Sequence, residues 1–483
     1  MKILFATHNN NKLREAREIL KNHIIIGLSD LCVNYEEVEE TGKTFFENAY
    51  LKAKYFYDKY DLPTIADDTG ICCYALNLMP GVHSKRLSKS GNDFDNINKL
   101  LMMLENKRDK RAYFSSVICF IFNNKTYFFE GKLEGLIINE LRGNNGFGYD
   151  PIFYIEKLNK TLAELEANEK NEISHRRDSL DRLENFLKEI KMEEKILLEA
   201  KKVFNTDKIE IMHRLLGGMS NVTYVIKVYD KLYTFRYPGE KAEYFVDRSV
   251  EEKNIKLFEK LGVTNKTTYF STETGIKVSE YIEGTSLNLI SNEKYPFEDV
   301  AMLLKKIHNV EWKSDNDYNP FKRLEKYEQY CIEKGFVLPK SYLNIRDKFF
   351  TYKDYLQSLP KSFAHGDSQP SNFIITGRGL KVVDFEFTGN IDHIYDIACF
   401  ANMRISDGEK LLETYYFGDV KDNEWFRFYS WRCFQCLQWF NVAVFKHLIG
   451  MSELLKINFL KVSEHYLDLA NELYLKAQTY NKL

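Results

Sequence analysis

The spacing of apolar and polar residues in the first 190 positions predicts alternating strands and helices. Lys2–Ala6 reads as a strand, and Lys12–Asn22 reads as a helix that a run of asparagines opens. Phe45–Tyr60 has the period of a second helix. Ala112–Phe122 is rich in β-branched and aromatic residues, and the turn residues Asn123-Asn124 lead from it into a further strand, so we expect a hairpin. This mixture predicts an α/β domain.

The order of elements is different in the rest of the chain. Strand signals dominate from Ile209 to Tyr237, and turn-like residues at Gly217-Gly218 and Asp230-Lys231 divide them, as in the sheet of a small lobe. After Phe297 the pattern is mostly helical up to the C-terminus. Strands followed by helices predict an α+β domain with two lobes.

The boundary between these regions falls near residue 192. Leu180–Met192 predicts a helix that closes the first region, and Glu193–Phe204 predicts a separate amphipathic helix that opens the second, with no Gly/Ser-rich linker between them. A chain of 483 residues exceeds the size at which a single hydrophobic core keeps growing. We therefore expect two domains, residues 1–192 and residues 193–483.

Composition and charge narrow the class of protein. The net charge of -2 and the absence of a long basic run argue against a general role on nucleic acid or at a membrane surface. No apolar stretch reaches the length of a membrane span and the chain begins directly with a strand, so we expect a cytoplasmic protein without a signal peptide. The eight cysteines are scattered, and the pair Cys433/Cys436 lacks the further ligands that a zinc site needs, which favours reduced thiols.

Several polar stretches of the first region suit the hydrolysis of a nucleoside triphosphate. The turn from Phe5 to Lys12 joins a strand to a helix and presents backbone N–H groups to an anion. Lys12 and Lys52 can add positive charge at the phosphates. A single lysine of this kind is usually a solvated surface charge, so the argument depends on the combination.

Three carboxylates complete the set. Glu40, Asp67 and Asp68 offer the oxygen ligands that Mg²⁺ prefers. We expect the two aspartates at the end of a strand, directly after the apolar run Leu62–Ala66, where one binds the metal and the other orients or deprotonates water. An isolated Asp-Asp pair before Thr-Gly is most often a turn. The order and spacing of all these residues together favour a catalytic site.

Residues 1–190 resemble the family of noncanonical purine nucleoside triphosphate pyrophosphatases, also called inosine triphosphatases. The stretches that carry the resemblance are Ala6–Lys12, Glu40–Gly42, Thr44-Phe45, Glu47–Ala49, Ala66–Gly70, Pro80-Gly81, Ser84, Arg86, Gly146–Pro151 and Ile173–Arg176. The resemblance implies a mixed sheet with flanking helices, a Mg²⁺ cofactor, and cleavage of the α–β phosphate bond of substrates such as ITP, dITP and XTP. It also implies a possible homodimer through this domain.

The resemblance implies roles for single residues as well. The implied phosphate contacts are Thr7, Asn9 and Lys12, the implied metal ligands are Glu40 and Asp68, and the implied further substrate contacts are Thr69, Phe147, Gly148, Tyr149, Asp150, Lys170, His175 and Arg176. Asp68 is also the implied proton acceptor. Two residues depart from the family pattern: His8 replaces the usual glycine of the phosphate turn, and Thr69 replaces the usual serine but keeps the hydroxyl.

The chemistry of the bases fits these contacts. Hypoxanthine and xanthine present a 6-keto acceptor, whereas adenine presents an amino donor. Fixed donors from Lys170, His175 and Arg176 would therefore face a donor on adenine, which is a large penalty. Phe147 lies between two glycines that allow close approach, so its ring can stack on a base.

The second region contains residues that suit phosphoryl transfer, which needs a base near the acceptor hydroxyl, Mg²⁺ ligands and cations on the ATP phosphates. Asp367 and Asn372 lie five residues apart on one predicted loop. Asp384 follows the apolar run Leu380–Val383 at the expected end of a strand, where it can bind Mg²⁺. Each motif alone is weak, because a lone His-Gly-Asp is usually a turn. The ordered pair at this separation is a strong indication.

Residues 195–480 resemble the aminoglycoside phosphotransferase and choline kinase superfamily, most of all bacterial choline kinases. The stretches that carry this resemblance are Gly217–Asn221, Phe235–Gly239, Arg248 with Glu251, Glu280–Gly284, His365–Asn372 and Asp384–Asp396. The resemblance implies a protein-kinase-like fold of two lobes, with ATP as co-substrate and Mg²⁺ as cofactor. The implied catalytic base is Asp367, the implied metal ligands are Asn372 and Asp384, and the implied ATP-binding residues are Gly218, Ser220, Asn221, Arg236 and Glu251. Arg236 stands where protein kinases have lysine, and Glu252 is an alternative partner for it.

An aromatic cluster bears on the acceptor. Trp425, Trp431 and Trp439 lie in one stretch with Tyr429 and Phe440. Aromatic residues at helical spacing are more often core packing, but aromatic faces also bind quaternary ammonium groups. The cluster favours a cationic amine over an aminoglycoside.

The sequence therefore predicts a bifunctional enzyme that acts on small molecules, with no nucleic-acid or membrane partner. One domain hydrolyses noncanonical purine nucleoside triphosphates to a monophosphate and pyrophosphate, and the other phosphorylates choline or a similar amino alcohol. The alternatives for the second domain are an ethanolamine, aminoglycoside or other small-molecule kinase, or a non-catalytic module.

Overall fold

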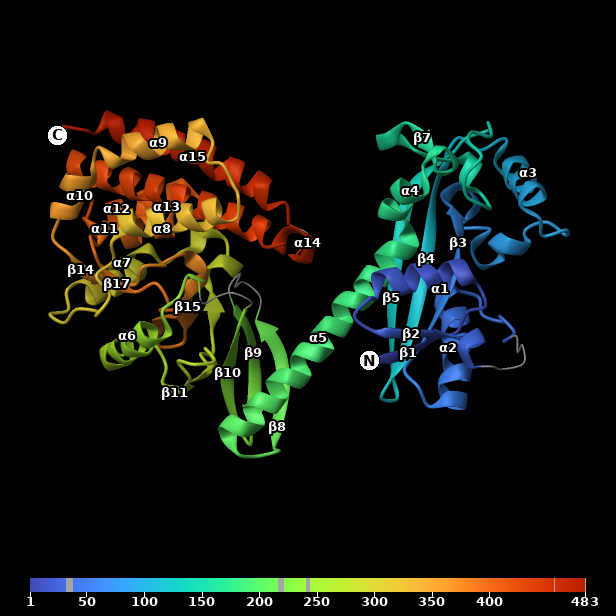
Figure 1. Cartoon of the computed structure of the whole chain (residues 1–483), viewed down its shortest axis with the longest axis horizontal. Coiled ribbons are helices and arrows are strands. Elements are labelled where there is room, and N and C mark those ends of the chain that lie inside the picture. Colours follow the sequence, from blue (N-terminus) through green and yellow to red (C-terminus); the bar gives the residue numbers. More distant parts are fainter. Residues whose placement is uncertain (32–37, 216–220, 240–243, 456, 483) are drawn as a thin grey trace. The chain divides into compact units, whose positions relative to one another are not determined.

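A computed structural model describes residues 1–31, 38–215, 221–239, 244–455 and 457–482 (Figure 1). The chain divides into two compact units, Met1–Glu194 and Lys195–Leu483. The division falls inside one continuous helix, α5 (His175–Phe204), where the sequence predicted two helices, Leu180–Met192 and Glu193–Phe204. That prediction was wrong because no glycine or proline interrupts the helical pattern at their junction.

The first unit is built on a sheet with the strand order β2-β1-β3-β4-β5-β6-β7. Its strands in the described residues are β1 (Lys2–Phe5), β2 (Ile24–Gly27), β3 (Thr64–Cys73), β4 (Arg111–Phe122), β5 (Lys125–Ile137), β6 (Phe153–Ile155) and β7 (Lys160–Thr161). The helices of this unit before α5 are α1 (Asn10–Ile19), α2 (Phe45–Tyr60), α3 (Asp93–Leu104) and α4 (Ala167–Ile173). β1 pairs in parallel with β2 and β3, and the other pairs are antiparallel, so the predicted mixed sheet is confirmed.

Helices cover both faces of this sheet, and alternate side chains of β1 pack against helices on opposite faces. Ile3 and Phe5 pack in one apolar cluster with side chains of α1 and of the first part of α5. Leu4 and Ala6 pack in another cluster with side chains of α2. The predicted helix Phe45–Tyr60 and the hairpin at Asn123-Asn124 are both confirmed. Both asparagines have positive φ, 49° and 58°, as a two-residue hairpin turn of this hand requires.

Strand β3 is longer than the sequence suggested. The sequence predicted Asp67 and Asp68 at the end of a strand, but β3 continues beyond them to Cys73 because β4 pairs with it residue by residue over its whole length. On the other side, the pairing with β1 stops at Phe5 opposite Ile65. The two aspartates therefore lie within a strand, but beyond the carboxyl end of its parallel neighbour, where the turn to α1 begins.

After the last part of α5, the second unit continues with a sheet of strand order β11-β12-β10-β9-β8. Its elements are β8 (Ile209–Leu215), β9 (Asn221–Val228), β10 (Lys231–Pro238), α6 (Arg248–Leu261), β11 (Thr267–Phe270) and β12 (Lys277–Glu280). The predicted turn at Asp230-Lys231 is confirmed as the link between β9 and β10, whereas the turn predicted at Gly217-Gly218 lies outside the described residues.

The rest of this unit is mostly helical, as predicted (Figure 1). The helices are α7 (Phe297–His308), α8 (Pro320–Glu333), α9 (Lys340–Phe350), α10 (Lys353–Ser358), α11 (Ile394–Phe400), α12 (Ile405–Tyr415), α13 (Asp422–Leu448), α14 (Met451–Leu455) and α15 (Phe459–Thr479). The short strands are β13 (Thr285–Ser286), β14 (Ser362–Ala364), β15 (Phe373–Thr376), β16 (Gly379–Val382) and β17 (Gly389–Ile391). Most side chains of α13 are buried, so this helix is the centre of the lobe. Within the described residues, no helix has both the length and the apolar character of a membrane span.

Candidate active sites

The two aspartates of β3 point to opposite faces of the sheet, because neighbouring residues of a strand alternate. Asp67 lies on the face of α1 and α5: its carboxylate is 2.9 Å from Lys12 Nζ and 3.6 Å from Arg176 Nε. Asp68 lies on the face of α2, where Asn48 Nδ2 donates to its Oδ2 at 2.9 Å. The adjacent carboxylates therefore have different neighbours.

Their titration differs for the same reason. Burial raises the pKa of Asp68 to about 6, although the charge of Lys52 and the hydrogen bond from Asn48 oppose this. Burial acts in the same direction on Asp67, but the charges of Lys12 and Arg176 outweigh it and lower the Asp67 pKa below its usual range. Asp68 can thus take up a proton near neutral pH, while Asp67 stays ionised.

The turn before α1 is built by its own side chains. Asn9 caps the helix: its Oδ1 accepts hydrogen bonds from the backbone N–H groups of Asn11 and Lys12, at 2.9 and 3.2 Å. The N–H of Asn9 in turn donates to Thr7 Oγ1 at 3.2 Å. This places Thr7, Asn9 and Lys12 at the N-terminus of a helix, the end that favours an anion.

The predicted metal ligands lie around a lysine. Lys52 Nζ is 2.6 Å from Glu40 Oε1. Burial opposes the charge of Lys52, but the carboxylates of Asp67 and Asp68 outweigh it, so the Lys52 pKa is raised. Carboxylate oxygens near one another are the donors that Mg²⁺ prefers, so Glu40 and Asp68 fit this ion. In the described part of the chain no three His, Cys, Asp or Glu side chains form a metal cluster.

The residues predicted to contact the nucleobase include a loop, residues 147–150, that an ion pair between Lys170 and Asp150 closes. Lys170 Nζ is 2.5 Å from Asp150 Oδ2, and the N–H of Phe147 donates to the same oxygen at 2.8 Å. Lys170 Nζ also lies 5.0 Å from the centre of the Phe147 ring, which is 65% exposed. Gly148 donates to Asp93, while Tyr149 turns inward and its hydroxyl donates to Ser84 O at 2.7 Å. An exposed ring next to a fixed ammonium group is thus available for stacking.

His175 lies within the electrostatic range of Lys170, which closes this loop, and of Lys12, which is a predicted phosphate contact. Its ring stacks on Phe114 at 5.0 Å, and both ring nitrogens are buried without a hydrogen-bond partner in the described residues. Burial lowers the His175 pKa well below its usual range, and the charges of Arg176, Lys170 and Lys12 act in the same direction. A Cβ on Gly131 would lie 2.0 Å from the His175 carbonyl oxygen, so this glycine lets the start of α5 approach the sheet. The ring is therefore a neutral hydrogen-bonding group that the chain itself leaves unsatisfied.

In the second unit, the loop that carries Asp367 is held by Asp396. The backbone N–H groups of His365 and Gly366 each donate to the Asp396 carboxylate at 2.8 Å. His308 Nε2 lies 3.0 Å from the same carboxylate. Gly366 has a φ of 79°, and a Cβ there would lie 2.0 Å from the carbonyl oxygen of Phe387. Asp396 and the glycine thus fix the path of this loop.

Asp367 is arranged as a base. Its Oδ2 accepts hydrogen bonds from Gln369 Nε2 and Asn372 Nδ2, both at 3.1 Å, which leaves Oδ1 for another partner. Burial raises the Asp367 pKa to about 7, and the negative charge of Asp384 contributes in the same direction. A carboxylate with this pKa can accept a proton from a bound hydroxyl near neutral pH.

The predicted metal ligands of this unit lie beside it. Asp384 follows β16 as predicted and has a φ of 69°, which turns its side chain out of the strand direction. Its Oδ1 is buried and has no hydrogen-bond partner among the described residues. The Asn372 amide nitrogen is used in bonds to Asp367, so its amide oxygen is the atom left to coordinate. An unsatisfied carboxylate oxygen and an amide oxygen fit Mg²⁺.

A network of charged groups surrounds the predicted ATP-binding arginine. Arg236 on β10 pairs with Glu251 on α6 through two bonds of 2.6 and 3.0 Å. The alternative partner, Glu252, instead pairs with Lys256. Asn221 donates to Glu386 at 3.1 Å. Gly218 and Ser220, the other predicted ATP-binding residues, lie outside the described residues.

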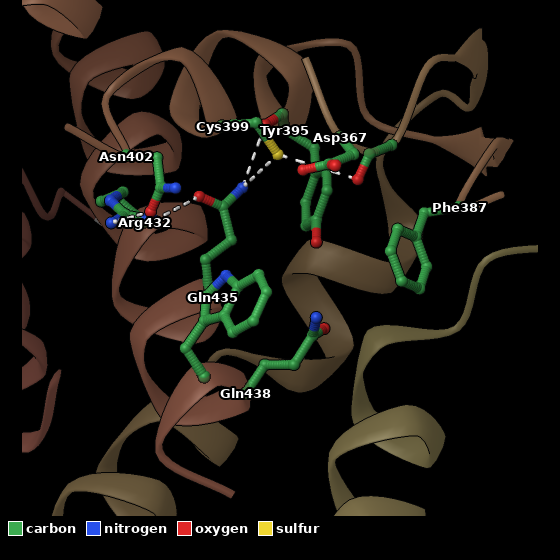
Figure 2. A pocket seen from close by; sticks show the side chains of 10 residues that line it. Asp367, Phe387, Tyr395, Cys399, Asn402, Arg432, Gln435 and Gln438 are labelled. Atoms are coloured by element: carbon green, nitrogen blue, oxygen red, sulfur yellow. Dashed lines mark hydrogen bonds between the residues drawn. The ribbon is translucent and has the colours of Figure 1, made fainter. Parts of the chain in front are cut away.

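A pocket of about 360 Å³, which includes space open to solvent, lies next to Asp367 (Figure 2). Phe387, Tyr395, Arg432 and Trp439 are among its lining residues. Of the five aromatic residues that the sequence grouped, Trp439 alone lines this pocket. The remaining four are core side chains or pack against the core: Trp425, Tyr429, Trp431 and Phe440.

Reasoning from the sequence missed several residues. Asn48, Gln369 and His308 touch predicted catalytic groups or the residue that anchors them, yet none was assigned a role. Asp396 was noted within a motif but was given no function. The spacing of Asn48 and Lys52, four residues apart on a predicted helix, is a signal that could have placed Asn48 on the catalytic face. Asp396 is 30 residues from Gly366 in sequence, and no local pattern reveals such a contact.

Comparison with known proteins finds a different family for each of the two units. The sequence model of the Ham1 family matches residues 3–186, and that of choline/ethanolamine kinase matches residues 212–409. The dITP/XTP pyrophosphatase of Thermoanaerobacter pseudethanolicus is 45% identical over 192 residues, which are 39% of this chain and 96% of that protein. A Ham1 protein from Coxiella burnetii has 41% identity and a TM-score of 0.38, covering 39% of this chain and 99% of that structure. The choline kinase LicA from Streptococcus pneumoniae has 25% identity and a TM-score of 0.46, covering 57% of this chain and 99% of that structure.

These matches define the chain as an enzyme that joins a hydrolase domain to a transferase domain. Through its first unit, the chain belongs to the Ham1 family. Its second unit contains the choline/ethanolamine kinase domain.

Proposed function

We propose that the chain is bifunctional and that its first unit hydrolyses noncanonical purine nucleoside triphosphates such as dITP, XTP and ITP. The products are the nucleoside monophosphate and pyrophosphate. The observation that carries this proposal is the pair Asp67/Asp68, in which one carboxylate is held ionised by Lys12 and Arg176 and the other has a pKa of about 6. The identity to a dITP/XTP pyrophosphatase over nearly its whole length supports the substrate class.

The residues of the chain divide the work of this reaction. Lys12, with the N-terminus of α1, binds the phosphates, and Mg²⁺ held by Glu40 and Asp68 would neutralise their charge. Asp68 accepts the proton of a water molecule whose oxygen attacks the α-phosphorus. The bond from that phosphorus to the α–β bridging oxygen breaks, and pyrophosphate leaves. His175 and Lys170 donate to the keto group of the base, and Phe147 stacks on its face.

For the second unit we propose ATP-dependent phosphorylation of a hydroxyl group on choline or a similar small amino alcohol. The observation that carries it is the convergence of Asp367, Asn372 and Asp384 beside a pocket. Asp367 accepts the proton of the acceptor hydroxyl, whose oxygen bonds to the γ-phosphorus of ATP while ADP leaves. Arg236, fixed by Glu251, contacts the phosphates, and Mg²⁺ at Asn372 and Asp384 would hold them in place.

One experiment tests both proposals on the intact chain. Purified protein is incubated with Mg²⁺ and dITP, XTP, ITP, dATP or dGTP, and pyrophosphate is measured. Separately, ADP release from ATP is measured with choline, ethanolamine and kanamycin as acceptors. We expect pyrophosphate from the first three nucleotides and ADP release with an amino alcohol. Equal cleavage of dATP would contradict the first proposal, and phosphorylation of kanamycin in place of the amino alcohols would contradict the second.

A further inference from the structure

A chain of hydrogen bonds joins the proposed base Asp367 to a buried arginine on α13. Gln369 Nε2 donates to Asp367 Oδ2 at 3.1 Å, and Asn402 Nδ2 donates to Gln369 Oε1 at 3.0 Å. Arg432, which is 1% exposed, then donates from Nη2 to Asn402 Oδ1 at 3.1 Å, as Figure 2 shows. The guanidinium and the carboxylate that line this pocket are therefore connected through two side-chain amides.

The two charged ends fix the direction of every bond in this chain. A guanidinium can only donate hydrogen bonds, and an ionised carboxylate can only accept them. Asn402 therefore turns its oxygen to Arg432, which leaves its nitrogen for Gln369. Gln369 in turn presents its nitrogen to Asp367. Because donors that all point the same way polarise one another, the charge of Arg432 strengthens the last bond, the one to Asp367.

This last bond helps to set the orientation of the Asp367 carboxylate. Asn372 Nδ2 donates to the same oxygen, Oδ2, at 3.1 Å. Both side-chain donors thus meet at one oxygen, and Oδ1 stays available for the hydroxyl of the acceptor. If the Gln369 amide turned over, its oxygen would face the carboxylate and its nitrogen would face the nitrogen of Asn402. Arg432 opposes this turn, because it holds the Asn402 oxygen and so keeps the Asn402 nitrogen towards Gln369.

We propose that Arg432 and Asn402 are positioning residues of the kinase reaction, which act through Gln369 to keep Asp367 Oδ1 towards the acceptor hydroxyl. This inference rests on the proposed kinase function and adds two residues to its machinery. The phosphoryl transfer itself is unchanged: the hydroxyl proton goes to Asp367, the hydroxyl oxygen bonds to the γ-phosphorus, and ADP leaves. The competing explanation is a purely structural role for Arg432, whose Nη1 donates to Gln435 Oε1 at 3.1 Å within α13.

One substitution separates the two roles. In Asn402→Asp the carboxylate still accepts from Arg432, and more strongly than the amide does, so a structural link is kept. It cannot donate to Gln369, so the chain to Asp367 is interrupted. With Mg·ATP and the better of choline and ethanolamine, we expect kcat to fall by about tenfold or more and the KM for ATP to change by less than about threefold. The midpoint of thermal unfolding, followed by tryptophan fluorescence, should not fall.

Gln435→Glu is the matched control, since it places the same charge at the other terminal nitrogen of Arg432. Gln435 Nε2 donates to the Tyr395 carbonyl oxygen and to Cys399 Sγ, each at 3.1 Å, so this amide belongs to a different set of bonds. The kcat of Gln435→Glu should therefore exceed that of Asn402→Asp by about fivefold or more. Equal values would mean that added negative charge, and not the interrupted chain, lowers the rate.

Variants of Arg432 then test the source of the effect. Arg432→Met should lower kcat by about tenfold, and Arg432→Lys, which keeps a charge and N–H donors, should recover part of the loss. Combining Arg432→Met with Asn402→Leu should lower kcat no further than the larger single loss, because both substitutions interrupt one chain. If a variant of Arg432 fails to fold, the comparison of Asn402→Asp with Gln435→Glu still decides the question.

Three results would overturn the inference and leave the proposed kinase function in place: an unchanged kcat in Asn402→Asp, equal kcat values in the two carboxylate variants, or losses that multiply in the double variant. An unsubstituted protein that releases no ADP with either amino alcohol would instead refute the proposed kinase function, and this inference with it.

Discussion

The two proposed bases, Asp68 and Asp367, reach similar pKa values in unlike surroundings. Burial is the largest cause of the upward shift in both, to about 6 and about 7. The charge with the largest effect differs in sign: Lys52 lowers the pKa of Asp68, and Asp384 raises that of Asp367. Asp68 lies within a regular strand, while Asp367 lies on an irregular loop.

This difference shows two ways to hold a base. The strand β3 is fixed by its ladder to β4, so the position of Asp68 depends on backbone hydrogen bonds that many residues share. The loop of Asp367 depends on one side chain, Asp396, which accepts from two successive backbone N–H groups. The first arrangement should resist single substitutions near the base, and the second should be sensitive to one.

The largest expected effect comes from removing each base in turn. Asp68→Asn should lower pyrophosphate release from dITP by about 1,000-fold, since the amide cannot accept the proton of water, and should leave ADP release by the kinase unchanged. Asp367→Asn should do the reverse. Both activities are measured on the same preparation, so each is the folding control for the other. Loss of both activities in either variant would contradict the assignment of separate sites.

How far the sequence predicted these sites depends on the range of the contacts. Local signals located the helix Phe45–Tyr60, the hairpin at Asn123-Asn124 and the placement of Asp384 after a strand. The continuation of β3 beyond Asp67-Asp68 was missed, because the residues locally favour a turn and the strand that pairs with them, β4, is distant in the chain: Asp67 lies opposite Ile118 and Asp68 opposite Val117. The strand is thus an outcome of non-local pairing.

The same limit applies to side-chain partners. The sequence offered Glu251 and Glu252 as partners of Arg236, and only the orientation of α6 decides between them. It also treated the tryptophans as one cluster, although α13 is buried on most of its surface, so helical spacing cannot tell which face meets a cavity. Arg432, buried on the same helix, carried no signal at all in the sequence.

The next largest effect should follow from the anchor of the second loop. Asp396→Asn replaces a carboxylate that accepts two backbone bonds and contacts His308 with a neutral amide that can accept on one atom. We expect kinase kcat to fall by about 100-fold and the second unit to lose about 2–4 kcal/mol of stability. The measurements are steady-state kinetics and chemical denaturation followed by tryptophan fluorescence. Thr69→Ser, a substitution on β3 beside Asp68, is the comparison, and it should change dITP hydrolysis by less than about threefold.

A smaller effect concerns the pH dependence of the two activities. Each base works in its deprotonated form, so kcat/KM should be low in acid and rise with pH. The rise should be centred near 6 for dITP hydrolysis and near 7 for the kinase, in line with the two pKa values. Lys52→Met removes a charge that lowers the Asp68 pKa. The rise of kcat/KM for dITP hydrolysis should therefore move to higher pH, while the rise for the kinase stays at the same pH. If the rise for dITP hydrolysis moved to lower pH, or did not move, Lys52 would not lower the pKa of Asp68.

The smallest expected effect separates two tryptophans of one helix. Trp439 lines the pocket beside Asp367, whereas Trp425 stacks on Tyr429 and Tyr480, each at 5.9 Å between ring centres. Trp439→Leu should raise the KM for the best acceptor by about three- to tenfold with little change in the KM for ATP, because it alters one wall of the acceptor pocket. Trp425→Leu should leave both KM values unchanged and lower the stability of the second unit by about 1–3 kcal/mol, as expected for an aromatic side chain that only packs. An acceptor KM that responds to Trp425→Leu and not to Trp439→Leu would place the acceptor on the other side of α13, away from Asp367, and would contradict the shared pocket on which the kinase mechanism depends.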